Sequence, residues 1–371
     1  MKERETKEAI LLLEDGKIYR GKSLGKIGTS SGELCFNTGM TGYQEIFTDP
    51  SYFGQIIITT VPHVGNYGVV KKEVESGQVQ IKGLVCKEFS EYFSRNSAEG
   101  SLQEYFEIAN IIGICEVDTR ELVRYIRDKG AMNAIISSDE SDIEVLRGKL
   151  KETPSMDGLE LASKVSTTAE YHLDAPERTF KVAILDLGVK KNILNNFTKR
   201  GCECRVFPFD TSFEEMEKWG PDGYFISNGP GDPAATTQAV QNVTKMLEEE
   251  KPLFGICMGH QILAQASGIS TYKMHNGHRG LNHPVKNLLT GRCEVTSQNH
   301  GFAVDAEQVK NNQNVEITHI NLNDGTVEGI RVKGKPAFSV QYHPESSPGP
   351  HDSAYLFDEF IELLKKSKSE A

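Results

Sequence analysis

The sequence lacks any hydrophobic run long enough to cross a bilayer. Its longest apolar runs, at residues 9–13 and 56–58, fall far short of the roughly 20 apolar residues that a spanning helix needs. Positive charge is also in short supply, with 41 Lys and Arg against 52 Asp and Glu, for a net charge of −11. This balance argues against nucleic acid or a membrane surface as the partner.

Cysteine is sparse and shows no disulfide framework. The seven cysteines are an odd number and are scattered, which favours a reducing cytoplasm. The first eight residues are charged and lack the apolar core of a signal peptide, so we expect a cytoplasmic protein. The 371 residues, 38% hydrophobic and 25% charged, suffice for two or three globular domains.

Residues 1–150 are rich in predicted strands. Two short apolar runs flank Asp15-Gly16, which predicts a β-hairpin over residues 9–20. Within residues 117–130, VDTRELVRYIRDKG predicts a helix that begins after Asp118 or Thr119 and stops at Gly130. Catalytic motifs are lacking in this part, so we expect it to serve as a docking domain.

The pattern changes after a polar, aperiodic stretch at residues 151–179, which we interpret as a linker. In residues 180–371, short apolar strands such as KVAIL, GYFI and PLFGI alternate with helical segments. This alternation predicts an α/β fold with a mostly parallel sheet flanked by helices. The full prediction is therefore a strand-rich α/β N-terminal domain, a linker and a C-terminal α/β domain.

One phosphate-binding motif is best rejected. Residues 16–23, GKIYRGKS, match the pattern G-x-x-x-x-G-K-[ST]. That loop must leave a buried strand and open a helix, whose N-terminus holds the phosphates. Here the motif falls inside the predicted hairpin, so we expect no ATP site in this chain.

Cys257 is the candidate nucleophile. It lies in PLFGICMGHQILAQASG, where a predicted strand precedes it, a predicted helix follows it, and glycines stand two residues away on each side. This is the pattern of a sharp strand–turn–helix elbow, best known with serine. The helix N-terminus favours a thiolate. The alternative is a buried packing cysteine, the usual state of a free cysteine.

A proton carrier and an oxyanion site complete the prediction. In VQYHPE, His343 and Glu345 face the same side of an extended strand, so Glu345 can orient the imidazole. The backbone N–H of Met258 is one expected oxyanion donor. The loop SNGPGDP supplies the second from Gly229 or Gly231, since Pro230 has no N–H.

Two other groups of residues are weaker candidates. Cys202 and Cys204 form a lone pair on one predicted strand, and packing explains them better than metal binding. His275, His278 and His283 lie close together in the sequence, but no neighbouring Cys or carboxylate completes a ligand set. We therefore expect no metal.

Together, FGICMGHQ, SNGPGDP and QYHPE resemble a class I, or triad, glutamine amidotransferase domain. NTGMTGYQEIFTDPSY, PHVGNYG, VDTRELVR, NHPVKN, SQNHGFAVD and HPESSPGPHD resemble the small, glutamine-hydrolysing subunit of carbamoyl phosphate synthetase. The resemblance covers nearly the whole chain. One departure is Met258, where many members have leucine; only its backbone N–H is needed.

The resemblance implies a set of roles. Cys257 would be the nucleophile, His343 the general acid and base, and Glu345 its orienting carboxylate. The implied contacts to L-glutamine come from Ser51, Gly229, Gly231, Met258, Gln261, Asn299, Gly301 and Phe302. Ser51 makes physical sense only if the N-terminal domain folds against the amidase domain near its site.

The resemblance also implies a partner. Ammonia would pass to a large, ATP-dependent synthetase subunit in a heterodimer, with ATP and Mg²⁺ bound there and no cofactor in this chain. Three alternatives remain: an amidotransferase subunit of another synthase such as anthranilate synthase, a stand-alone γ-glutamyl cysteine hydrolase, and a catalytically silent interaction subunit. The sequence does not distinguish a pyrimidine from an arginine pathway.

Overall fold

The computed structural model describes residues 6–370 and divides the chain into two compact units, residues 1–156 and 157–371. The uncertain residues 1–5 include most of the charged N-terminal segment used above, which therefore lies outside the description. Among the described residues, no helix combines the length and apolar character that crossing a membrane requires.

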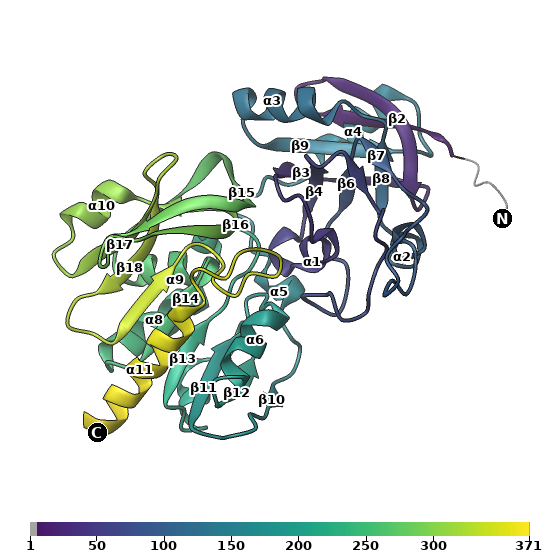
Figure 1. Ribbon diagram of the computed structural model, residues 1–371. Coiled ribbons are helices and arrows are strands. Elements are labelled where there is room, and N and C mark those ends of the chain that lie inside the picture. The colour runs from purple at the N-terminus through teal and green to yellow at the C-terminus, as the bar shows by residue number, and fades with distance from the viewer. Residues whose placement is uncertain (1–5, 371) are drawn as a thin grey trace. The chain divides into compact units, whose positions relative to one another are not determined.

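The first unit is built around a closed barrel (Figure 1). Its strand order is β1-β2-β8-β6-β4-β3-β9. The barrel strands are β1 (Glu8–Leu13), β2 (Ile18–Gly25), β3 (Thr29–Asn37), β4 (Gln55–Thr59), β6 (Gly83–Val85), β8 (Ile112–Cys115) and β9 (Met132–Ser137). The other elements of this unit are α1 (Tyr43–Thr48), η1 (Pro50–Tyr52), β5 (His63–Val64), β7 (Glu88–Phe89), α2 (Leu102–Ile108), α3 (Thr119–Lys129) and α4 (Ile143–Lys151).

Local sequence signals in this unit are confirmed. β1 and β2 pair antiparallel around a turn in which Gly16 has φ 94°. α3 begins after Asp118, whose side chain accepts a hydrogen bond from the Glu121 N–H, and ends before Gly130 at φ 96°. The rejected phosphate-loop motif occupies the hairpin turn and β2 itself, with a strand where the mechanism requires a helix.

The second unit contains a ten-stranded sheet with the order β10-β12-β11-β13-β14-β19-β18-β17-β15-β16. Its strands are β10 (Tyr171–Leu173), β11 (Phe180–Leu185), β12 (Cys202–Phe207), β13 (Gly223–Ile226), β14 (Leu253–Ile256), β15 (Thr271–Asn287), β16 (Cys293–Val304), β17 (Val315–Asn321), β18 (Val327–Val332) and β19 (Ala337–Val340). In that order, the strands from β12 to β19 are parallel to one another, and the rest pair antiparallel.

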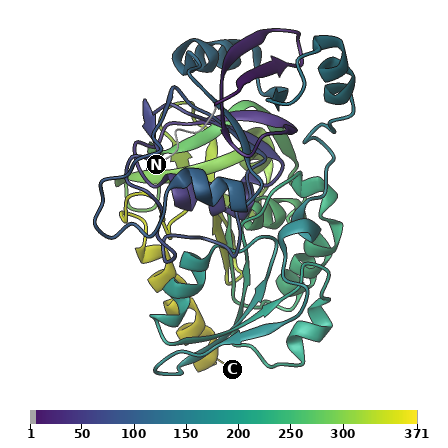
Figure 2. The ribbon, with the colours of Figure 1, turned by 90° about the vertical axis from the view of Figure 1, so that its right-hand side faces the viewer.

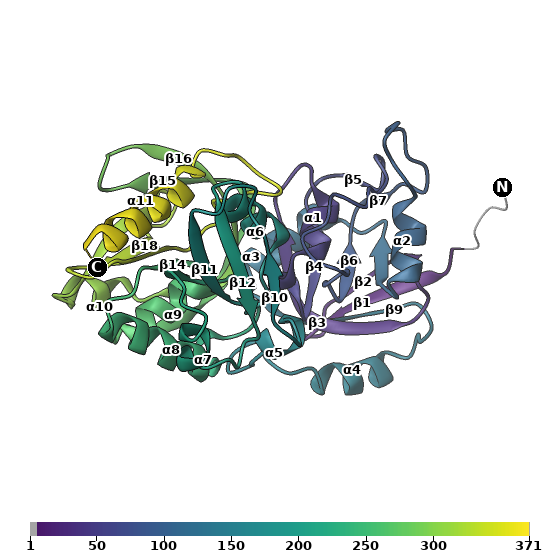
Figure 3. The same cartoon turned by 90° about the horizontal axis from the view of Figure 1, so that it is seen from below.

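Helices cover both faces of the parallel strands (Figure 3). The helices of this unit are α5 (Ala162–Val165), α6 (Lys191–Thr198), α7 (Phe213–Glu217), η2 (Pro233–Ala235), α8 (Thr237–Glu248), α9 (Met258–Ala266), α10 (Ala306–Asn311) and α11 (Tyr355–Glu370). α7, α8 and α9 pack on one face, and α6 and α11 on the other. In Figure 2, α11 (yellow) runs beside the sheet strands against which its aromatic residues pack.

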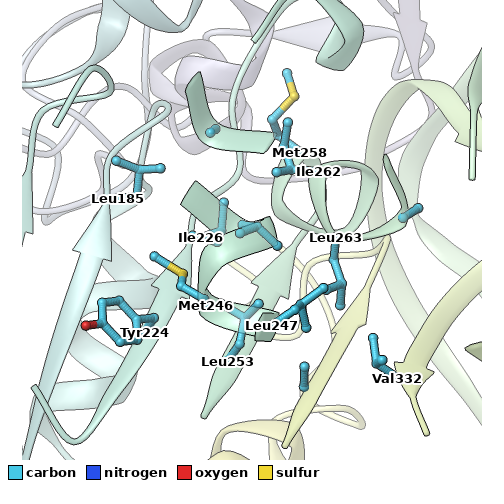
Figure 4. Close-up of a cluster of buried hydrophobic side chains, with 14 of the residues drawn as sticks. Leu185, Tyr224, Ile226, Met246, Leu247, Leu253, Met258, Ile262, Leu263 and Val332 are labelled. Carbon is cyan, nitrogen blue, oxygen red and sulfur yellow. The ribbon is translucent and has the colours of Figure 1, made fainter. Parts of the chain in front are cut away.

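The alternation of side chains along β11 produces these two cores. Ala183 and Leu185 belong to the cluster with α8 and α9, whereas Val182 and Ile184 belong to the cluster with α6 and α11. Figure 4 shows the first cluster, including Leu185, Ile226 and Met258. A strand buried on both faces reads as a continuous apolar run, which is why KVAIL could be predicted.

The α/β class is confirmed, but the sheet expected to be mostly parallel has four parallel and five antiparallel pairings of strands. Two further details also differ. The stretch 151–179, expected as a linker, contains α5 and β10, and β10 pairs antiparallel with β12 at the sheet edge. Polar sequence concealed this edge strand, since only one of its faces is covered. The long β15–β16 hairpin was only partly foreseen, because its first strand is rich in Gly, Asn and His rather than in β-branched residues.

Candidate active site

Cys257 stands at the turn between β14 and α9. Its backbone has φ 55° and ψ −102°, a conformation that side-chain-bearing residues rarely adopt. Such strain costs about 1–3 kcal/mol and persists only where the surrounding structure enforces it. Here the Cys257 N–H donates to Val340 O on the neighbouring strand β19 at 2.9 Å. The predicted elbow is therefore present.

The flanking glycines are required by packing. A Cβ on Gly255 would lie 2.6 Å from Gly259 O, and a Cβ on Gly259 would lie 2.2 Å from Ile226 O. Both distances are far below van der Waals contact, so the backbone of α9 can approach β13 and β14 only without these side chains. This confirms the physical reason for the G-x-C-x-G spacing.

His343 and Glu345 lie together at the end of β19, and both are almost completely buried. His343 Nδ1 is 2.7 Å from Glu345 Oε1. The extended strand that was expected to align them stops earlier, at Val340, and Ser346 N–H closes a turn on His343 O at 3.1 Å. The pairing is as predicted, but a turn, rather than strand alternation, produces it.

Lys190 is a member of this site that sequence reasoning missed. Its Nζ lies 2.9 Å from Glu345 Oε1 and 2.8 Å from Ser346 O, and its side chain is only 3% exposed. Asn192 adds a hydrogen bond from its side-chain amide to Glu345 O. A lysine five residues after β11, in a chain with many surface lysines, carries little signal; its position beyond the carboxyl end of a parallel strand was the one available clue.

The buried charged side chains of this group shift one another's pKa values. Burial raises the pKa of Glu345, but the positive charges of Lys190 and His343 outweigh it and hold that pKa below its usual range. For His343, burial lowers the pKa of the imidazole, and the Glu345 charge with hydrogen bonding to Cys257 and Glu345 raises it overall. Glu345 therefore stays ionised and favours a protonated imidazole.

The second ring nitrogen of His343 is the one available for chemistry. Nε2 is buried and makes no hydrogen bond of standard geometry within residues 6–370, while the thiol of Cys257 contributes to the raised pKa of the ring. The Cys257 Sγ itself lies 3.6 Å from Asn299 O. The arrangement can hold a thiolate beside an imidazolium, which is how cysteine nucleophiles are activated.

Several residues of the predicted glutamine site lie around the elbow in the same unit. The Gln261 side-chain amide donates to Phe302 O at 2.9 Å and to Gln341 Oε1 at 3.0 Å. Asn299 is the residue whose carbonyl meets the Cys257 thiol, and Gly301 follows on the same strand, β16. Met258 begins α9, and its side chain is buried in the core.

The other predicted glutamine contacts include Gly229, Gly231 and Ser51. A Cβ on Gly229 would lie 2.2 Å from Leu187 O, and one on Gly231 2.5 Å from Leu159 O. Close packing thus explains both glycines by itself, and an oxyanion role for either stays a prediction. Ser51 lies in η1 of the barrel unit, where its N–H donates to Asp49 Oδ1 at 2.9 Å; its contact with glutamine also stays a prediction.

Both parts of the chain match known families. The family described as glutamine amidotransferase class-I matches residues 183–363. The family described as carbamoyl-phosphate synthase small chain, CPSase domain, matches residues 11–136. Among solved structures, a putative GMP synthase component from Thermoplasma acidophilum aligns with 52% of this chain and 96% of its own, with 19% identity and a TM-score of 0.43.

Curated relatives match over nearly the full length. Proteins named carbamoyl phosphate synthase small chain from Chlorobaculum tepidum and Vibrio vulnificus are each 46% identical, over 97% of this chain and 99% of their own. The protein of that name from Thermotoga maritima is 47% identical over the same shares. At this identity and coverage, the chain belongs to the carbamoyl phosphate synthase small chain family, and its second unit carries a class-I glutamine amidotransferase domain.

Proposed function

We propose that this chain is the glutamine-hydrolysing subunit of a carbamoyl phosphate synthetase. The observation that carries the proposal is the position of Cys257, strained at the head of α9 in the same unit as the buried His343–Glu345–Lys190 group. A packing cysteine would need neither the strained turn nor two buried charged partners nearby. The family indicates the substrate class, which is a side-chain amide, and the reaction that uses the ammonia.

The first half-reaction forms a thioester. The Cys257 thiolate attacks the side-chain carbonyl carbon of L-glutamine, forming a C–S bond and a tetrahedral oxyanion. Backbone N–H groups, that of Met258 among them, stabilise the oxyanion. The C–N bond then breaks as the His343 imidazolium gives its proton to the departing nitrogen, which leaves as ammonia.

The second half-reaction restores the enzyme. Neutral His343 takes a proton from water, and the hydroxide attacks the thioester carbon. The C–S bond breaks, glutamate leaves, and the thiolate–imidazolium pair is regenerated. Glu345, fixed by Lys190, holds the imidazole in one orientation throughout both halves and stabilises its positive charge.

The ammonia needs a protected route, because protonation in water at neutral pH removes its nucleophilicity. We infer that it passes to a large partner subunit, which would bind ATP and Mg²⁺ and make carbamoyl phosphate from bicarbonate. This chain would need no cofactor of its own. The N-terminal barrel unit, in which no catalytic motif was found, would serve the docking of that partner, and the complex would work in the cytoplasm.

The decisive experiment replaces Cys257 by Ser in the assembled enzyme. We expect glutamine-dependent carbamoyl phosphate synthesis to fall by several orders of magnitude while ammonia-dependent synthesis stays at the parent level. Cys293→Ser, which alters an exposed cysteine, is the matched control and should leave both activities intact. If glutamine-dependent synthesis survived in Cys257→Ser, the assignment would be wrong.

A further inference from the structure

Three buried side chains from three strands meet beside β16, apart from the Cys257 group. They are His278 on β15, His300 on β16 and Glu328 on β18, with 8%, 4% and 0% of their surface exposed. One possible ligand atom of each lies within 4.8 Å of the others. His278 and His300 are directly paired across the β15–β16 ladder, and their rings stand nearly perpendicular with centroids 4.9 Å apart.

The tautomer of His300 is fixed by its backbone partner. Its Nδ1 lies 2.8 Å from Phe302 O, a carbonyl that can only accept, so Nδ1 carries the hydrogen. Nε2 therefore presents a lone pair, and this buried atom has no hydrogen-bond partner among the residues that the structure describes. Burial, with a smaller effect of the His278 charge, holds the pKa of His300 well below its usual value, so the ring is neutral. An unsatisfied buried acceptor costs about 1–3 kcal/mol and calls for a physical reason.

His278 and Glu328 are held by partners on their outer sides. His278 Nε2 lies 2.8 Å from Asp324 Oδ2, while its Nδ1 faces Glu328 Oε1 at 3.5 Å. Glu328 accepts hydrogen bonds from the side-chain amides of Gln298 and Asn321, each at 2.9 Å. A carbonyl behind one imidazole and a carboxylate behind the other is the usual outer arrangement of metal-bound histidines.

We propose that His278 Nδ1, His300 Nε2 and a Glu328 carboxylate oxygen bind a divalent transition metal ion, with zinc as the best fit. Two imidazoles and one carboxylate are a common protein ligand set for zinc. Zinc bonds of about 2.0–2.1 Å place tetrahedral ligands roughly 3.4 Å apart. The widest pair, at most 4.8 Å apart, would therefore close by no more than about 1.4 Å on binding.

Two carboxylates face His278 and supply negative charge to the cluster. Burial lowers the pKa of His278, but the hydrogen bonds and charges of Glu328 and Asp324 raise it overall. A cation bound at His278 Nδ1 would be balanced by the negative charge of these two carboxylates. His283 stands next to the group, with its Nδ1 also buried and unpartnered and its ring centroid 5.3 Å from that of His278.

The ion would tie β15, β16 and β18 together next to Asn299 and Gly301, which flank His300 on β16. Its role would be to fix the strand that carries these predicted glutamine contacts. Sequence reasoning rejected a metal here because no carboxylate stands near His275, His278 and His283 in the chain. The fold supplies Glu328 and Asp324 from a segment about 45 residues further on.

The test is titration of the chelator-treated full chain with Co²⁺, followed by its visible absorption, and with Zn²⁺ in competition with a chromophoric chelator. A Cys257→Ser background prevents the ion from binding the elbow cysteine. We expect one equivalent bound, a higher unfolding temperature, and an absorption spectrum of nitrogen and oxygen ligands without the intense near-ultraviolet bands of a cobalt–thiolate bond.

Glu328→Gln and His300→Gln should each weaken binding at least tenfold. His275→Gln, an exposed histidine on the same strand, is the matched control and should bind as the parent does. If either variant fails to fold, the parent protein still tests the proposal through its cobalt absorption spectrum and its metal stoichiometry. No stoichiometric binding at micromolar metal, or equal affinity in folded cluster variants, would overturn the proposal. Neither readout depends on glutamine hydrolysis.

Discussion

Lys190 and Glu345 form an ion pair that is almost wholly removed from solvent, with Nζ 2.9 Å from Oε1 and side-chain exposures of 3% and 0%. The pair joins the segment after β11 to the turn after β19. Because Glu345 also contacts His343, the lysine acts on the imidazole through the carboxylate. It is a positioning residue: it holds one charge in place and stabilises it.

Lys190→Met leaves the Glu345 carboxylate buried with only His343 to balance it. Removing one partner of a buried pair costs about 3–5 kcal/mol, and we expect the free energy of unfolding to fall by that order at neutral pH. The kcat/KM for glutamine should fall with it. Urea unfolding and a glutaminase assay test this, with Lys191→Met, an exposed neighbour, as the matched control. Equal effects of the two substitutions would contradict the role given to Lys190.

The same variant should shift the acid limb of the pH profile. The pKa of Glu345 lies below its ordinary value in the folded protein, so its stabilising effect is present above the unfolded value and is lost as pH falls through the folded one. Without the ammonium, the pKa of Glu345 rises and this loss begins at higher pH. A profile of kcat/KM against pH should therefore lose activity earlier on acidification in Lys190→Met than in the parent.

Glycine-to-alanine substitutions in two helices should have opposite effects. At Gly259 the new Cβ would lie 2.2 Å from Ile226 O, so α9 must move, and we expect a loss of at least about 2 kcal/mol and of glutaminase activity. At Gly148, exposed in α4 with nothing within 4 Å, alanine should stabilise the barrel unit by about 0.5–1 kcal/mol. Denaturant unfolding measures both, and a stable, active Gly259→Ala would refute the packing argument for the elbow.

His260 should make stability depend on pH. Burial, with a small effect of the His319 charge, lowers the pKa of His260 from 6.5 to about 3. Below pH 6.5 the unfolded chain binds a proton that the folded chain does not, so stability falls as pH falls, by about 1.4 kcal/mol per unit from this group. The difference in unfolding free energy between the parent and His260→Gln should therefore shrink from pH 7 to pH 4.5.

Urea titrations at several pH values between these limits measure that difference. His275→Gln controls for the loss of an exposed histidine. A parent-to-variant difference for His260→Gln that is independent of pH would show that the ring takes up a proton in the folded state, contrary to its complete burial.

Two different alkylating reagents should label different cysteines. Cys293 is exposed, whereas Cys257 is 3% exposed, and burial raises the pKa of Cys202 to about 12. Brief iodoacetamide treatment should therefore label Cys293 first. A chloroketone shaped like glutamine should instead label Cys257, and added glutamine should slow that labelling. Peptide mass spectrometry reads out both, and preferential labelling of Cys293 by the glutamine-shaped reagent would count against the proposed site.

Features that depend on a few neighbouring residues could be predicted from the chain alone. The β1–β2 turn needs a residue that tolerates positive φ, and Gly16 supplies it. The elbow needs glycine on each side of Cys257, because any side chain there would collide with backbone. The pair His343 and Glu345 was found because Glu345 follows His343 by two positions, although a turn rather than a strand brings them together.

Features that depend on segments far apart could not be predicted in this way. The closure of the barrel through β1 and β9, the position of Lys190 against Glu345, and the meeting of His278, His300 and Glu328 each join residues tens to more than a hundred positions apart. No periodicity or local spacing records such contacts, because they arise from strand order and side-chain burial. The sequence by itself determined the elbow, the alternation of strands and helices, and the pairing of the candidate residues His343 and Glu345. Only the tertiary structure decided which charged side chains face one another. Such pairs form where folding buries side chains from distant segments together and removes the water that would otherwise separate them.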